Sequence, residues 1–264
     1  MGEAAGEAGW PRTLDPAAWA GRRVLVVAPH PDDEAFGAGG TAHLAARAGA
    51  QVEVLVVARG DGGVSGGAEP AQRELESQRC CELLGTRPPV FLRVPSSELR
   101  EDPAAAGRAA AEALGAARFD VLLVPSPLER HDTHRAALLA ALCGDLGTPA
   151  AAWWGWSVWT ELPLGPGVVE VDNTSARSAK TLAMTAHASQ NRGRGLAAAM
   201  AARDLAQATF SRITGDETRK AVERLLDLSA LGQQRPVPDA TTARARCAAF
   251  AADHARAWLT GLWG

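Results

Sequence analysis

One imidazole and three carboxylates follow one another in the chain, directly after a short apolar stretch at residues 24–28. The group consists of His30, Asp32, Asp33 and Glu34. Acidic residues are common at helix starts, where they cap free N–H groups and complement the helix dipole, so the carboxylates alone have an ordinary structural explanation. The histidine changes this balance, because imidazole and carboxylate together are well-attested ligands of zinc. The pattern therefore indicates a metal site.

A second polar group lies much further along the chain and also follows an apolar stretch, at residues 121–124. It contains His131, Asp132 and His134. In open α/β sheets, ligands bind in the loops at the carboxyl ends of the strands. Two such loops in one parallel sheet can converge. We therefore expect both polar groups to contribute to one site.

The residue types in the two groups suit hydrolysis by a metal-activated water. A catalytic zinc site needs three protein ligands and one open position, and His30, Asp33 and His134 supply such a set. Asp32 is then available as general base toward a water whose pKa the metal lowers. His131 could stabilise an oxyanion or protonate the leaving amine, which requires its imidazolium form during the reaction. The same donors accept iron, manganese or cobalt, although zinc is favoured.

Alternating strand and helix signals predict the scaffold of this site. Strands are predicted at 24–28, 52–58, 90–94, 121–124 and 168–171, and helices at 37–50, 69–84, 103–117, 176–189, 196–211, 217–228 and 241–262. Alternation of this kind means a parallel sheet with helices on both faces. We expect a doubly wound, mostly parallel α/β fold with a helical C-terminal part.

The composition predicts a single domain that acts on a small molecule. Of the 264 residues, 47% are hydrophobic, which is enough for one large core. A net charge of -3 provides no basic field for nucleic acid. The N-terminal residues lack the pattern of a secretory signal and no run approaches membrane-spanning length, so we expect a cytoplasmic protein without membrane association. Apolar residues at helical spacing near the C-terminus are compatible with a homo-oligomer.

Residues 29–34 read Pro-His-Pro-Asp-Asp-Glu and residues 131–134 read His-Asp-Thr-His. These stretches resemble the two signature motifs of the LmbE/PIG-L-like N-acetylsugar deacetylase family. Three further segments resemble that family in order and spacing, namely Arg73-x-x-Glu76, residues 158–163 and residues 180–190. The resemblance covers about residues 22–215, which leaves 1–20 as an N-terminal extension and 216–264 as C-terminal helices of one domain, 1–264.

The family resemblance implies a Rossmann-like fold and zinc-dependent hydrolysis of an amide on a sugar-like amine, usually an N-acetylglucosaminyl group. It assigns metal binding to His30, Asp33 and His134. It assigns the role of general base to Asp32 and electrophilic assistance to His131. It also implies that Arg73 reaches the sugar hydroxyls. An arginine close to Glu76 on a helix is, however, often part of an ordinary ion pair.

Two departures from the family pattern bear on the substrate. Ser96 stands where many relatives have an aspartate, so a neutral hydroxyl replaces a carboxylate acceptor for sugar hydroxyls. Some relatives use a tyrosine near the second motif, but this chain has none, and Glu129 stands in that neighbourhood. The acceptor sugar is therefore expected to differ. We expect an acetylated amino sugar or small glycoside as substrate, with specialised-metabolite biosynthesis as one setting.

Three other functions are compatible with the sequence. Residues 63–67 satisfy the G-x-S-x-G pattern, which would make Ser65 the nucleophile of a serine hydrolase, but the two glycines that follow Ser65 weaken a helix start there. An amidase that cleaves a larger amide of a sugar–thiol conjugate would use the same metal chemistry. A non-catalytic protein that binds a metal or a sugar would keep the fold, yet every residue that the chemistry needs is present.

Two further features have both a packing and a binding explanation. Four tryptophans, at positions 153, 154, 156 and 159, stand close together. Indoles can stack on sugar faces, but core or subunit packing is their commoner use. His187 could approach the site, or it could be a structural histidine with a buried partner.

Overall fold

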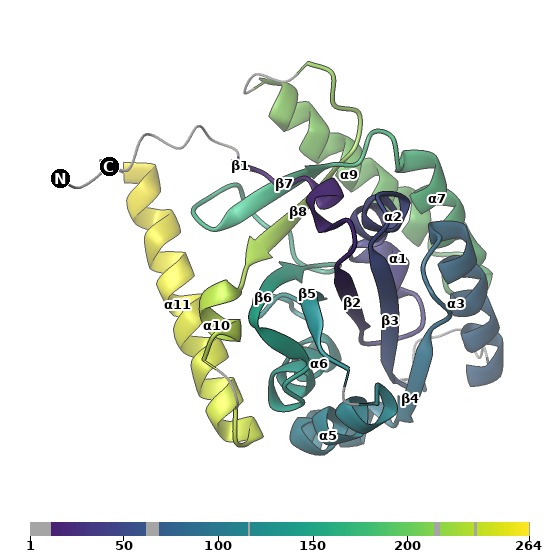
Figure 1. The fold of residues 1–264 in the computed structure, drawn as a ribbon. Coiled ribbons are helices and arrows are strands. Elements are labelled where there is room, and N and C mark those ends of the chain that lie inside the picture. Colours follow the sequence, from purple (N-terminus) through teal and green to yellow (C-terminus); the bar gives the residue numbers. More distant parts are fainter. Residues whose placement is uncertain (1–11, 62–68, 116, 214–216, 235–236, 264) are drawn as a thin grey trace.

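The computed structural model describes the backbone of residues 12–61, 69–115, 117–213, 217–234 and 237–263, and the side chains in these ranges except those of 212–213 and 261–263. Within these ranges, one eight-stranded sheet has the order β1-β7-β8-β6-β5-β2-β3-β4 (Figure 1). The strands are β1 (Arg12–Thr13), β2 (Arg23–Ala28), β3 (Gln51–Ala58), β4 (Val90–Val94), β5 (Phe119–Pro125), β6 (Gly147–Trp156), β7 (Val168–Asp172) and β8 (Val222–Asp227).

The helices cover both faces of this sheet (Figure 1). They are η1 (Pro16–Trp19), α1 (Asp33–Phe36), α2 (Gly39–Arg47), α3 (Pro70–Leu84), α4 (Ser96–Glu101), α5 (Pro103–Ala113), α6 (Asp132–Cys143), α7 (Arg177–Ala186), α8 (Ala188–Asn191), α9 (Leu196–Ile213), α10 (Ser229–Gly232) and α11 (Ala240–Trp263). One apolar core lies between the sheet and α5, α6 and α11, and the other between the sheet and α2, α3, α7 and α9. The predicted fold class is confirmed.

The pairing of β2 positions the two polar groups. This strand lies between β3 and β5, and both neighbours run parallel to it, so that Val26 pairs with Val54 on one side and Leu123 on the other. All three residues are buried, as expected for a central parallel strand with helices on both faces. Because β2 and β5 are parallel neighbours, the loops at their carboxyl ends lie side by side.

One predicted helix is wrong. Residues 217–228 contain β8, which runs antiparallel to β6 and β7. Its Glu, Arg and Leu residues favour a helix by propensity, but Glu223 and Arg224 are buried and each has a partner of opposite charge in the fold, Lys180 and Glu170. Tertiary ion pairs therefore override local preference, and the C-terminal part begins with a strand rather than a helix.

Strand β6 was not predicted, although it contains three of the four clustered tryptophans. It pairs with β5 on one side and with β8 on the other. The predicted helix at 176–189 is also divided into α7 and α8, with His187 between them. In the part of the chain that the structure describes, no helix has the length and apolar character needed to cross a membrane.

Candidate metal centre

The three predicted metal ligands meet at the carboxyl ends of β2 and β5. His30 follows β2, Asp33 begins α1, and His134 lies in the first turn of α6. Asp33 Oδ2 is 3.1 Å from His30 Nδ1 and 3.2 Å from His134 Nε2. Donors bound 2.0–2.1 Å from a tetrahedral zinc ion lie about 3.3 Å apart, so the spacing and the two-nitrogen, one-oxygen donor set fit such an ion.

Burial and mutual contact set the charges of these ligands. Burial alone would raise the pKa of the Asp33 carboxyl, but His134 and His30 outweigh it and hold that pKa well below its usual range. Burial likewise opposes a charge on His134, yet Asp33 and Glu129 raise its pKa to about 9. The Asp33 carboxyl is therefore ionised between two imidazoles.

Asp32 is held in an unusual backbone conformation beside this cluster. Its φ of 149° and ψ of -31° are rarely adopted by a residue with a side chain, and strain of this kind is concentrated at functional sites. Burial and the charge of Asp33 raise the pKa of its carboxyl to about 7, and Arg73 opposes the shift. Such a carboxyl can take up and release a proton near neutral pH.

His131 stands at the N-cap position of α6 and faces the same group. Its ring centroid is 5.2 Å from that of His30 and 4.7 Å from that of His134. Partial desolvation and the two neighbouring histidines lower its pKa to about 4. The resting imidazole is therefore neutral at pH 7, and a role as acid requires it to gain a proton during the reaction.

Arg73 is buried against Asp32 and does not form the ion pair with Glu76 that its helix position suggested. Its Nη2 donates to Asp32 Oδ2 at 3.3 Å and to the carbonyl of Pro31 at 3.1 Å, while its Nη1 donates to the carbonyl of Gly60 at 2.7 Å. Glu76 instead accepts hydrogen bonds from Ser189. Arg73 thus holds the loop that carries Asp32.

All six predicted site residues line one cavity of about 500 Å³. They are His30, Asp32, Asp33, Arg73, His131 and His134. Trp159 and Arg194 lie at the same cavity. Half of the Trp159 surface is exposed, whereas Trp153 and Trp156 are completely buried, so the tryptophan group divides into core residues and one cavity residue.

The indole of Trp156 packs against His134, one of the three predicted metal ligands. Its ring lies edge-on to the imidazole of His134, with centroids 5.9 Å apart. On its other side it packs on Gly37, where an added Cβ would lie 2.4 Å from the indole. The absence of a side chain at Gly37 is therefore necessary for this packing.

Glu129 has a role that the sequence did not reveal. Its Oε2 lies 3.4 Å from His134 Nδ1 and accepts a 2.7 Å hydrogen bond from the N–H of Val158, and Oε1 accepts one from the N–H of Arg130 at 2.9 Å. A carboxylate behind a ligating histidine fixes the ring and increases its basicity. The available signal was its position two residues before His131, but the contact with Val158 depends on how β5 and β6 pair.

His187 is a structural histidine rather than a cavity residue. It is fully buried, and its Nε2 lies 3.2 Å from Glu34 Oε1, which also accepts a hydrogen bond from Ser77. Cys80 completes a group that could hold a metal by position alone. Burial and the charge of Glu34 raise the pKa of the Cys80 thiol well above its usual value, which disfavours the thiolate that a metal needs.

Two serines that the sequence singled out, Ser96 and Ser65, are not among the residues that line this cavity in the described part of the chain. The Ser96 hydroxyl donates to Asp61 Oδ1 at 3.2 Å, so a carboxylate is still present beside the position that lost one. Ser65, the alternative nucleophile, lies outside the described residues.

Residues 25–142 match the family model for PIG-L, GlcNAc-PI de-N-acetylase. This part of the chain is therefore similar to the PIG-L family. The match to the PIG-L model includes every predicted site residue and ends before residues 158–163 and 180–190, which the resemblance had added. No curated protein matches the chain at a significant level.

Solved structures of similar fold extend over most of the chain. The conserved protein TT1542 from Thermus thermophilus is 22% identical, with a TM-score of 0.64 over 82% of this chain and 95% of that one. The N,N'-diacetylchitobiose deacetylase from Pyrococcus horikoshii is 20% identical, with a TM-score of 0.62 over 85% and 90%. GalB, the 4-carboxy-2-hydroxymuconate hydratase from Pseudomonas putida, is 18% identical, with a TM-score of 0.59 over 78% and 96%. The likeness of fold to solved structures therefore extends beyond residues 25–142.

Proposed function

We propose that this protein is a zinc-dependent hydrolase that removes the N-acetyl group from an amino sugar or small glycoside. The observation that carries the proposal is the contact of one carboxylate oxygen, Asp33 Oδ2, with both His30 and His134 at a cavity that also contains Asp32. The match to the PIG-L model supports an amide substrate on a sugar, since its family is described as a GlcNAc-PI de-N-acetylase.

The roles of the residues follow from their charges. A divalent ion held by His30, Asp33 and His134 would polarise the amide carbonyl and lower the pKa of a water molecule. Asp32, with a pKa of about 7, accepts a proton from the attacking water and can return it to the departing amine. His131, neutral at rest, donates an N–H hydrogen bond to the oxyanion that develops on the carbonyl oxygen.

The cavity supports a sugar-sized substrate. Its volume of about 500 Å³ suits a small glycoside, and the exposed Trp159 offers a flat apolar face for a sugar ring. Arg73 lines the cavity, which keeps its contact with a sugar hydroxyl as part of the proposal. A cytoplasmic location, the single-domain organisation and the absence of nucleic-acid and membrane partners stay predictions from the sequence.

A panel of acetylated amino sugars, scored by release of free amine, tests this function. We expect release from at least one N-acetylglucosamine derivative, loss of activity with a chelator, and recovery with zinc. Asp33→Asn should lose both zinc and turnover, while the matched Asp253→Asn, an exposed position on α11, should retain both.

Three results would contradict the proposal. Turnover only of a bulkier sugar–thiol amide would favour the amidase alternative. Zinc binding without release of amine from any amide would favour a binding protein. Hydration of an unsaturated acid, the reaction type in the name of GalB, would show that this fold carries different chemistry here.

A further inference from the structure

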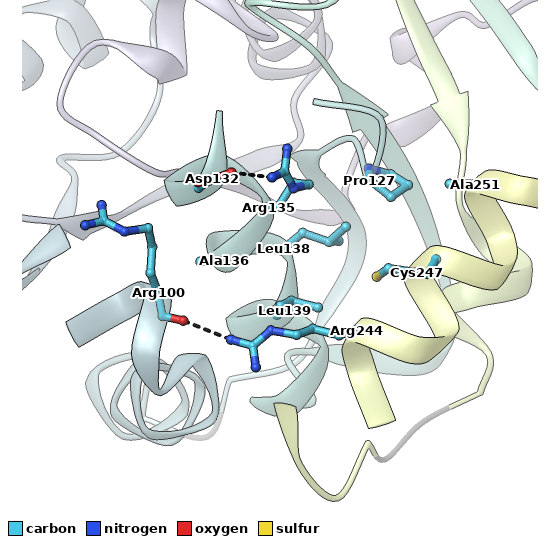
Figure 2. A pocket seen from close by; sticks show the side chains of 11 residues that line it. Arg100, Pro127, Asp132, Arg135, Ala136, Leu138, Leu139, Arg244, Cys247 and Ala251 are labelled. Carbon is cyan, nitrogen blue, oxygen red and sulfur yellow. Dashed lines mark hydrogen bonds and ion pairs between the residues drawn. The ribbon is translucent and has the colours of Figure 1, made fainter. Parts of the chain in front are cut away.

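A groove on the outer side of α6 lies apart from the metal-ligand cluster. It runs between α6 and α11 and has a volume of about 530 Å³, within the usual range of small-molecule sites. Leu138 and Leu139 of α6 form its apolar floor, and Cys247 of α11 faces them (Figure 2). Both leucines are almost completely buried, so the floor is part of the core and fixed in place.

The charged residues at the groove are mostly positive. Arg100, Arg135 and Arg244 line it together with one acid, Asp132, and Asp132 is paired with Arg135. Figure 2 shows Arg135 and Arg244 at opposite ends of the leucine floor. The lining therefore has an excess of positive charge close to an apolar surface.

Two of these arginines have no acidic partner among the residues that the structure describes. Arg244 Nη2 donates to the backbone carbonyl of Arg100 at 2.9 Å, and Arg100 Nη1 donates to Thr133 Oγ1 at 3.2 Å. Since a guanidinium has five N–H donors, each keeps donors for a further acceptor. The contact of Arg244 with a backbone oxygen fixes its position without neutralising its charge.

We propose that the groove between α6 and α11 binds a small amphipathic organic anion. Its carboxylate or phosphate group meets Arg244, and its apolar body lies against Cys247, Ala248 and Ala251 of α11, above the leucine floor. Charge complementarity selects this occupant, because a neutral apolar molecule makes no charged contact with Arg244, and an inorganic anion makes no use of the apolar wall formed by Cys247, Ala248 and Ala251. The proposal is independent of the deacetylase function.

Calorimetric titration with three probes of equal chain length tests the proposal. Octanoate and octyl phosphate carry the two anionic groups, and octanol carries neither. At physiological ionic strength we expect binding of at least one anion and at least about tenfold weaker binding of octanol, because hydrogen bonds between two charged groups are stronger than those of a neutral hydroxyl. The two anions distinguish a carboxylate ligand from a phosphate ligand.

Three variants locate the binding. Arg244→Gln should weaken binding of the anion about tenfold or more but leave octanol unchanged. Ala248→Trp should fill the groove and abolish binding of every probe, because Ala248 lines it. Ala252→Trp, a control at an exposed position on the same helix that does not line the groove, should bind as the unmodified protein does.

Several outcomes would overturn the proposal. Lack of binding of both anions at millimolar concentration would do so, as would equal affinity in Arg244→Gln. Equal affinity for octanol would indicate an apolar surface without anion selection. If neither anion binds and Ala248→Trp converts a dimer to a monomer in sedimentation, the groove is an interface between two copies of the chain. Should Ala248→Trp fail to fold by circular dichroism, the result for Arg244→Gln decides.

Discussion

Two groups of buried charged residues in this molecule differ in the size of the cavity beside them. The proposed metal-ligand cluster of His30, Asp33 and His134 opens into a cavity of about 500 Å³. A second group, Lys180, Asp204 and Glu223, joins α7, α9 and β8, and the cavity at Glu223 measures only about 10 Å³. That space is about one water-sized sphere. Burial of charge is common to both groups, so burial alone does not identify a site.

The difference lies in how far each group is compensated. Lys180 Nζ is 2.5 Å from Asp204 Oδ2 and 2.8 Å from Glu223 Oε1, and Glu223 also accepts hydrogen bonds from the N–H groups of Gly40 and Thr41. Beside the cluster of His30, Asp33 and His134, by contrast, burial and the charge of Asp33 raise the pKa of Asp32 to about 7, and Arg73 opposes this shift only in part. Burial also raises the pKa of Asp204, but only Asp32 lies at a large cavity. A shifted carboxyl at an open cavity is therefore the better indication of chemistry.

The largest expected effect separates chemistry from folding. Asp32→Asn should lower kcat by about 10²–10⁴-fold, the usual contribution of a general base, because an amide cannot accept the proton. Zinc content and the denaturant midpoint should stay unchanged, since the three proposed ligands remain. Steady-state kinetics, metal analysis and urea unfolding measure these quantities, and unchanged kcat would remove Asp32 from the mechanism.

For the group of Lys180, Asp204 and Glu223 we expect the opposite result, a loss of stability without a loss of turnover. Lys180→Met leaves Asp204 and Glu223 buried without their cation, so the free energy of unfolding should fall by about 3–5 kcal/mol. Turnover per folded molecule should be retained, because Lys180 is not among the residues that line the cavity. Urea unfolding followed by circular dichroism gives the first quantity. Loss of kcat at full stability would show that this comparison of the two groups is wrong.

An intermediate effect is expected at the residue that supports the metal-ligand cluster. Glu129→Gln keeps the hydrogen-bond acceptor for Val158 but removes the charge facing His134, so zinc affinity should fall about 10–100-fold. Competition with a chromophoric chelator measures the affinity, and Glu98→Gln, at an exposed position of α4, is the matched control. Equal zinc affinity in both variants would leave Glu129 with only a backbone-capping role.

The smallest effect is expected at the mouth of the cavity. Trp159→Ala should raise KM about 2–10-fold with little change in kcat, because an aromatic contact contributes about 0.5–1.5 kcal/mol. Leu182→Ala removes an equally exposed apolar side chain from α7 and serves as control. A fall in kcat alone would indicate that Trp159 orients the reacting group instead.

The sequence predicted the metal-ligand cluster better than the compensated group for a physical reason. His30, Asp33 and His134 lie in the loops, or in the first turns of the helices, that follow strands whose apolar runs are easy to recognise, and parallel pairing then brings these segments together. Glu223 lies in a stretch whose propensity favours a helix, and only its distant partner Lys180 explains the strand. Likewise, the contact of Glu129 with His134 depends on ring orientation and strand pairing, which no local pattern encodes. Local sequence patterns therefore identified the three candidate ligands but not Glu129, which contacts one of them.

The packing of Trp156 on Gly37 has a consequence for the history of this chain. Any residue larger than glycine at position 37 would displace the indole, and the indole borders His134. Sequence change at a position without any functional group would thus be felt directly at a proposed ligand. In sequences descended from this chain, substitutions at position 37 should be as rare as substitutions of His30, Asp33 and His134. A larger residue at position 37 would require a different packing of Trp156 in strand β6.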